Sequence, residues 1–329
     1  MKQVPLGPTG LQVSQLCLGS MGFGWTASPN DSFAVMDAFV EAGGTFIDTA
    51  DIYSRWIPGH KGGEAEEIIG RWMKERGNRA RIVIATKVRG QMWDGPGGEG
   101  LSRAHIVRAA EDSLRRLQVE TIDLYQCHWP DEAVPPDETL RALEELLAAG
   151  KVRFIGASNY QLPALREALA ISAKHNLPRF ATLQPHHNLV HRKEWEEGLQ
   201  ATCIAENIGV IPYSPLAGGF LTGKYVRGGE RVASQRSGGV RQYFTPDGWS
   251  ALDALREVAD ARKTTCAAVA LAWQLAQPGI TAPIVGANSP AQLGDQLPAL
   301  SLTLSTTEMG RLDAASQPFL TNGSSHQGS

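Results

Sequence analysis

Short apolar runs alternate with longer amphipathic segments along the chain, and this alternation constrains the fold more than any other feature. The runs expected as strands are at residues 16–18, 46–48, 81–86, 122–127, 152–157, 181–183, 210–213 and 282–285. Segments with helical periodicity are at residues 32–42, 64–76, 102–117, 139–149, 162–173, 195–206, 250–262, 267–275 and 290–300. Eight strands that alternate with helices predict an α/β protein of the (β/α)8 TIM-barrel class.

A doubly wound sheet is the alternative architecture. It is disfavoured because no G-x-G-x-x-G pattern follows the first strand, where Gly19, Gly22 and Gly24 have the wrong spacing. The composition does not change along the 329 residues, so we expect one barrel domain at residues 1–317. A tail that we expect to be disordered follows at residues 318–329.

Three further segments are expected to decorate the barrel. Turn-forming residues at positions 7–10 divide residues 4–14 into the two arms of an N-terminal β-hairpin. Long irregular segments at 90–100 and 227–248 are expected to be loops at the C-terminal face of the barrel, where such loops often act as lids.

Charge and apolar content exclude several classes of function. The formal net charge is −3, so the chain lacks the basic surface of a nucleic-acid-binding protein. No apolar run approaches the roughly 18 residues of a membrane-spanning helix. The first residues lack the apolar core of a signal peptide, and the four cysteines show no CxxC spacing. We therefore expect a cytoplasmic protein with reduced thiols.

Ionisable side chains stand at the ends of three consecutive predicted strands. The second strand ends in Asp48, and Tyr53 follows five residues later. Lys87 follows the third strand, and His128 follows the fourth. Because the C-terminal ends of barrel strands meet at one mouth, we expect these four side chains to lie close together.

The four groups suit proton transfer to a carbonyl oxygen. A carboxylate such as Asp48 keeps a buried Lys87 charged, and the ammonium group lowers the pKa of a neighbouring phenol. Tyr53 then serves as proton donor to a developing alkoxide, and His128 donates a second hydrogen bond to the same oxygen. No residue is placed as a nucleophile with an adjacent base, so the missing partner is a hydride donor, which must be a cofactor.

These residues and their order resemble the aldo-keto reductase family over residues 3–317, and residues 6–14 are similar to the opening hairpin of many bacterial members. The family's catalytic tetrad corresponds to Asp48, Tyr53, Lys87 and His128. The resemblance implies reversible reduction of an aldehyde or ketone with a nicotinamide cofactor, with Tyr53 as the general acid. It extends to the potassium-channel β subunits.

The resemblance also assigns residues after the later strands to the cofactor. The nicotinamide site corresponds to Ser158, Asn159, Gln184 and the stacking ring of Tyr213. The segment Ser214–Lys224 resembles the pyrophosphate-binding loop, with expected contacts at Ser214, Leu216, Gly218 and Lys224. The segment 286–296 corresponds to the adenosine-phosphate site, with expected contacts at Gly286, Asn288, Gln292, Asp295 and Gln296.

The expected cofactor is NADP(H), and NAD(H) is the less favoured alternative. The family often has Arg or Lys where this chain has Ser289, which keeps NAD(H) open. Cations expected to compensate are Lys224 and the loop arginines Arg231, Arg236 and Arg241. An H-H-x-x-x-H pattern is formed by His186, His187 and His191, but related sequences often have Tyr at position 187, so no metal is expected.

Four tryptophans lie in or beside the loops after the first four predicted strands, namely Trp25, Trp56, Trp93 and Trp129. We expect them to line an apolar substrate pocket. The prediction is an NADPH-dependent carbonyl reductase with a small-molecule substrate, acting as a monomer or homo-oligomer without nucleic-acid or membrane partners. Two alternatives stay open, an NAD-linked sugar or alcohol dehydrogenase and a cofactor-binding, redox-sensing regulatory subunit.

Overall fold

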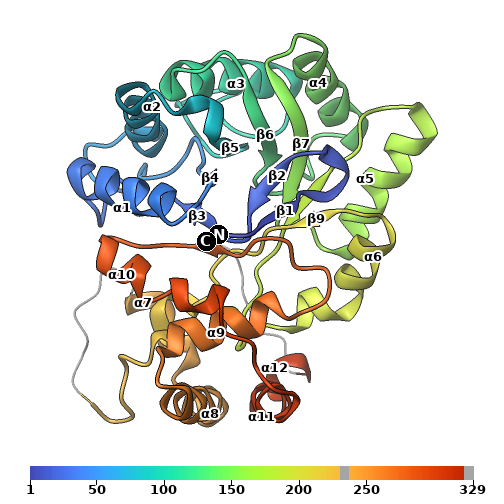
Figure 1. Ribbon diagram of the computed structural model, residues 1–329. Coiled ribbons are helices and arrows are strands. Elements are labelled where there is room, and N and C mark those ends of the chain that lie inside the picture. Colours follow the sequence, from blue (N-terminus) through green and yellow to red (C-terminus); the bar gives the residue numbers. More distant parts are fainter. Residues whose placement is uncertain (230–236, 322–329) are drawn as a thin grey trace.

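A computed structural model describes residues 1–229 and 237–321. Its main sheet has eight parallel strands in the order β10-β3-β4-β5-β6-β7-β8-β9 (Figure 1). The strands are β3 Cys17–Gly19, β4 Phe46–Asp48, β5 Val83–Val88, β6 Ile122–Cys127, β7 Val152–Ser158, β8 Thr182–Gln184, β9 Gly209–Val210 and β10 Ile284–Val285. From β3 to β9, neighbours in the sheet are also consecutive in the chain, as in a barrel.

Backbone hydrogen bonds join the first and last strands of this order. The N–H of Ile284 donates to the carbonyl of Pro212 (2.8 Å), and the N–H of Thr281 donates to that of Val210 (2.8 Å). The sheet therefore curls back on itself, and the predicted (β/α)8 barrel is confirmed.

The strands differ from their predicted bounds where proline interrupts the ladder. β9 ends at Val210, before Pro212, and β10 begins after Pro283, because proline has no N–H to donate to a neighbouring strand. β5 instead continues to Val88, so Lys87 lies within the strand rather than after it.

Helices cover the outside of the barrel (Figure 1). Those between β3 and β9 are α1 Pro29–Glu41, α2 Glu64–Arg76, α3 Arg103–Leu117, α4 Pro136–Ala148, α5 Leu162–His175 and α6 Gln200–Ala205. Their apolar faces form one core with the outer side of the sheet, with Trp72, Ile106 and Leu143 fully buried. α1 begins earlier than predicted, because Ser28 is its N-cap and Asp31 completes the capping box.

The predicted N-terminal hairpin is present as β1 Gln3–Pro5 and β2 Gln12–Ser14, which pair antiparallel. It covers the N-terminal ends of the barrel strands, where Leu6 and Val13 join the barrel-interior cluster. Gly7 makes this approach possible: a Cβ there would lie 2.6 Å from the Ala181 carbonyl oxygen and 2.6 Å from the Gly209 nitrogen, and its φ is +52°. The hairpin leaves the opposite end of the barrel uncovered, and this open end holds the predicted site.

A second cluster of helices lies beside the barrel, at the bottom of Figure 1. It contains α7 Ser237–Val240, α8 Pro246–Arg262, α9 Cys266–Leu275, α11 Thr306–Ser316 and α12 Pro318–Thr321. α10 Pro290–Gly294 instead packs beside α1, and its Leu293 belongs to the barrel core. α8, α9 and α11 share an apolar core that includes Trp273 and Leu312. The expected tail therefore begins with a helical turn, and its residues 322–329 lie outside the described residues, as do Arg231 and Arg236.

All four cysteines are free thiols, as predicted, and Cys17, Cys127 and Cys203 are buried. Within residues 1–229 and 237–321, no helix has the length and apolar character needed to cross a membrane.

Candidate active site

Three strands and one loop bring the four predicted catalytic side chains together at the open end of the barrel. The ammonium nitrogen of Lys87 lies 2.5 Å from Asp48 Oδ1 and 2.9 Å from the Tyr53 hydroxyl. It also donates to the Thr49 carbonyl at 2.8 Å. The rings of Tyr53 and His128 lie with their centroids 6.0 Å apart. The tetrad is thus one cluster, centred on the lysine.

Lys87 is completely buried, yet its surroundings keep it charged. Burial alone lowers the pKa of a lysine, but the negative charge of Asp48 and the hydroxyl of Tyr53 outweigh that effect, so the pKa of Lys87 is raised. A permanent ammonium group therefore stands within hydrogen-bond distance of the phenol oxygen.

Asp48 accepts hydrogen bonds from three side chains. Lys87 occupies Oδ1, while the amides of Gln126 (3.1 Å) and Gln184 (2.8 Å) both donate to Oδ2. Gln126 comes from the middle of β6, next to Lys87 in the ladder register. Sequence reasoning missed Gln126. Its contact with Asp48 becomes visible only when β6 is placed beside β5 in the barrel.

His128 lies at the end of β6, where its N–H donates to the Val88 carbonyl (2.9 Å). Burial, followed by the positive charges of Lys87 and Arg89, lowers the pKa of His128 well below its ordinary value. The imidazole is therefore neutral and carries one ring N–H to donate. Its ring stacks on Trp129, with a centroid distance of 3.8 Å.

The residues expected at the nicotinamide form a connected polar strip beside the tetrad. Ser158 Oγ donates to the Gln184 carbonyl (3.0 Å), and Asn159 Nδ2 donates to the His128 carbonyl (2.9 Å). The Tyr213 hydroxyl donates to Asn159 Oδ1 (2.8 Å). Asn159 has a φ of +58°, a conformation that asparagine tolerates better than most residues.

Tyr213 is held from one side by a column of aromatic rings. Its ring stacks on His186 at 4.9 Å, and His186 in turn stacks on His191 at 3.7 Å. His191 also pairs with Glu194 (2.8 Å). Two histidines of the H-H-x-x-x-H pattern thus form part of this column. The described residues contain no group of three His, Cys, Asp or Glu side chains arranged to hold a metal.

The loop after Tyr213 contains four left-handed residues, three of them consecutive. φ is +54° at Ser214, +50° at Ala217, +65° at Gly218 and +99° at Gly219. Successive backbone N–H groups in such a turn form a concave anion site. The exposed Lys224 folds back over it, since a Cβ on Gly219 would lie 3.1 Å from the Lys224 nitrogen.

The segment after β10 is ordered by its own side chains. Gln292 Oε1 accepts from the Asn288 N–H (2.9 Å), and Gln296 donates to the Gly286 carbonyl (3.0 Å). Asn288 Oδ1 accepts from Thr26 of the first loop (2.8 Å), a contact that sequence analysis missed. The expected contacts at Gly286 and Asp295 are exposed.

Ser289 has a definite structural role in this segment. Its side chain is the N-cap of α10 and accepts from the Gln292 N–H. The position where relatives often carry a cation is therefore occupied here by a helix cap.

Three of the four expected pocket tryptophans surround the tetrad. Trp56 is 46 % exposed and packs edge-on against both Tyr53 (6.4 Å) and Trp25 (5.5 Å). Trp129 covers His128 from the other side. Trp93, in the loop after β5, turns its ring toward α3, where it contacts His105 (4.9 Å).

A buried charged layer lies behind the Tyr53 loop, and the sequence analysis did not identify it. Glu66 of α2 accepts from Thr86 (2.6 Å) and from the guanidinium of Arg116 (2.7 Å). Burial and then the charge of Glu66 raise the pKa of Asp51 well above its ordinary value. The sequence shows these acids only as members of a loop and a helix, without their shared burial.

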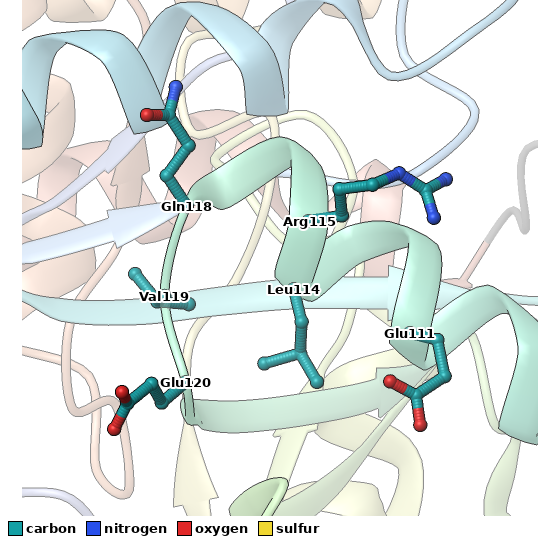
Figure 2. Close-up of a pocket in the computed structure, with 6 residues that line it drawn as sticks. All are labelled: Glu111, Leu114, Arg115, Gln118, Val119 and Glu120. Carbon is teal, nitrogen blue, oxygen red and sulfur yellow. The ribbon is translucent and has the colours of Figure 1, made fainter.

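A surface hollow lies far from this mouth, at the C-terminal end of α3 (Figure 2). It is lined by Glu111, Leu114, Arg115, Gln118, Val119 and Glu120. Because this end of α3 leads into the start of β6, the hollow lies at the N-terminal ends of the strands, opposite the tetrad.

The sequence matches one protein family over most of its length. The family described as "Aldo/keto reductase family" matches residues 15–317. The chain is 38 % identical to "Uncharacterized oxidoreductase YrpG" of Bacillus subtilis, over 92 % of each chain. It is 32 % identical to "L-glyceraldehyde 3-phosphate reductase" of Escherichia coli O157:H7, over 93 % of this chain and 90 % of the relative. It is 31 % identical to "Probable voltage-gated potassium channel subunit beta" of rice, over 92 % of each chain.

Proposed function

Because the chain belongs to the aldo/keto reductase family, we propose that it reduces an aldehyde or ketone to an alcohol, using NADPH and a proton from Tyr53. The observation that carries this proposal is the Lys87 ammonium group, which bridges Asp48 and the Tyr53 hydroxyl inside the barrel. The reaction balances as one hydride to the carbonyl carbon and one proton to its oxygen.

In this proposal Tyr53 is the catalytic acid. As the carbonyl oxygen gains negative charge, the phenol gives it a proton, and the remaining phenolate is stabilised by the ammonium group 2.9 Å away. Asp48 does not touch the substrate. It holds Lys87 charged and in place, which makes it a positioning residue.

The neutral His128 orients the carbonyl. A neutral imidazole donates a hydrogen bond to the oxygen but is a much weaker acid than imidazolium, so it does not replace Tyr53 as the proton donor. The lowered pKa of His128, caused by burial and the nearby cations, supports this role across physiological pH.

The chain's surfaces fit a nicotinamide dinucleotide, which when bound supplies the hydride. The column of His191 and His186 backs one face of Tyr213, so a flat ring on the opposite face would be held in one plane. The left-handed turn at 217–219, with Lys224 folded over it, suits a pyrophosphate. Ser158 and Asn159 lie between these surfaces and the tetrad.

NADPH is proposed over NADH on the strength of Lys224 and of Arg241. Arg241 directly follows Val240, whose side chain would lie 3.1 Å from a Cβ on Gly218. The cap formed by Ser289 is the observation that favours the alternative, an NAD-linked dehydrogenase of a sugar or another alcohol. Steady-state rates with each cofactor at saturating aldehyde decide between them. A kcat/KM for NADH equal to or above that for NADPH would reject the proposed preference.

The acid role is tested with Tyr53→Phe. We expect kcat to fall by about 10²–10⁴-fold while the Kd for NADPH, measured by fluorescence titration, stays unchanged. Tyr125→Phe is the matched control, because the buried Tyr125 hydroxyl has no hydrogen-bond partner within the described residues and lies outside the tetrad. A Tyr53→Phe enzyme with near wild-type kcat would refute the assignment.

A regulatory role is the second candidate, favoured by the likeness to proteins named as potassium-channel β subunits. Such a protein would bind NADPH tightly without turning over simple aldehydes. We propose the enzyme role, located in the cytoplasm, because the complete tetrad is formed and lies at the open end of the barrel. Tight NADPH binding without turnover across a panel of aldehydes would favour the regulatory role instead.

A further inference from the structure

Arg89 lies at the mouth of the barrel, immediately after the end of β5 and close to the tetrad. The strand ends at Val88, and Lys87 of that strand reaches the tetrad. The N–H of His128 donates to the Val88 carbonyl, which brings the next residue, Arg89, beside His128. Its charge contributes to the lowered pKa of His128.

The backbone of Arg89 is held in a conformation that a bulky residue rarely adopts. Its φ is +128°, and its carbonyl accepts from the Gly100 N–H (2.9 Å), which closes the loop between them. The following Gly90 packs so tightly on Ile52 that a Cβ would lie 2.5 Å from that side chain. Strain kept at a non-glycine residue beside catalytic groups points to a role for its side chain.

The guanidinium group of Arg89 has no partner within the part of the chain that the structure describes. Its Nε is buried without a hydrogen bond, and no described carboxylate pairs with it. Arg55, another arginine near this loop, by contrast donates to the Lys61 and Met92 carbonyls and pairs with Asp94. A partly buried cation without a partner is costly unless a ligand supplies the anion.

We propose that Arg89 binds an anionic group of the substrate, so that the enzyme acts on aldehydes or ketones that carry a carboxylate or a phosphate near the carbonyl. This inference rests on the proposed function and names its substrate class. A guanidinium fork matches the paired oxygens of both groups. Trp129, stacked on the neighbouring His128, supplies an aromatic wall for the rest of the molecule.

The test compares matched substrates. For the carboxylate, the pair is 4-carboxybenzaldehyde and its neutral methyl ester; for the phosphate, it is glyceraldehyde 3-phosphate and glyceraldehyde. We expect wild type to prefer the anion of at least one pair, and Arg89→Gln to lower that preference, as a ratio of kcat/KM values, by about 10–100-fold. The pair that responds identifies the anion.

Two further variants complete the design. Arg55→Gln is the matched control, and it should leave both ratios unchanged because the Arg55 guanidinium already has protein partners. Arg89→Gly removes the cation with a residue that accepts the positive φ, so it should lose the preference without loss of thermal stability.

The outcomes separate this inference from the proposed function. A wild type that prefers neither anion, or an equal loss for charged and neutral substrates in Arg89→Gln, would overturn the anion site. If wild type reduces no carbonyl compound, the proposed function fails. The anion-binding role of Arg89 is then still tested by the binding of benzoate and of inorganic phosphate, measured by tryptophan fluorescence. Binding that Arg89→Gln abolishes would support the site, and absent or unchanged binding would reject it.

Discussion

Replacing Asp48 by asparagine removes the charge at the centre of the tetrad while keeping the size of the side chain. Three N–H donors, from Lys87, Gln126 and Gln184, converge on its two oxygens. An asparagine accepts on one oxygen only, so its amide nitrogen would face either the ammonium group or the two glutamine amides. Neither orientation satisfies all the donors.

The size of the effect follows from burial. The side chain of Lys87 is 0 % exposed and that of Asp48 is 2 % exposed, so solvent does not screen the pair. Removing one partner of such a buried pair costs about 3–5 kcal/mol of the free energy of unfolding. That is a large share of the about 5–15 kcal/mol that stabilises a typical protein.

Asp51 provides the matched control, three residues away in the loop that follows β4, where it is also buried. Its Oδ1 accepts from the Ile52 N–H (2.6 Å), while Oδ2 has no partner within the described residues. Burial and the charge of Glu66 raise its pKa, so the native state binds the proton more tightly than the unfolded chain. Wild-type stability therefore falls as pH rises above about 4 through the raised pKa. Asp51→Asn removes this loss and should be as stable as wild type or more so at pH 7.

The assay is equilibrium unfolding in urea at pH 7, with wild type, Asp48→Asn and Asp51→Asn measured side by side. We expect a loss of about 3–5 kcal/mol for Asp48→Asn and no loss for Asp51→Asn. If Asp48→Asn lies within about 1 kcal/mol of wild type, the reasoning that the tetrad depends on a buried charge pair is refuted.

Three other predictions concern the site and the hairpin. The NMR signal of the His128 ring should show no titration around the ordinary histidine pKa of about 6.5, because burial and two cations lower its pKa; a midpoint at that ordinary value would contradict this. Gly7→Ala should destabilise the protein more than Gly10→Ala, since only the Cβ at position 7 would meet other atoms; equal melting temperatures would count against the proposed hairpin packing. His186→Ala should weaken NADPH binding by roughly 2–10-fold by releasing Tyr213, and an unchanged Kd would show that the column does not support that ring.

Strand order was readable from the sequence because it depends on local patterns. Each apolar run, its length and the polar residue that ends it are features of a few neighbouring residues. A barrel places consecutive strands side by side with their C-terminal ends together. The convergence of Asp48, Lys87 and His128 was therefore predictable, and the distances confirm that they form one cluster with Tyr53.

Contacts between distant segments were not readable in the same way. Gln126 meets Asp48 across 78 positions, and Trp93 turns to α3 although its loop lies next to the mouth. That the Nε of Arg89 has no partner among the described residues is visible only when the neighbouring side chains have been placed. Local sequence thus determined which residues stand at the strand ends. The tertiary structure alone decided which charges are buried together and which lack a partner, because burial and pairing depend on atoms from several elements at once.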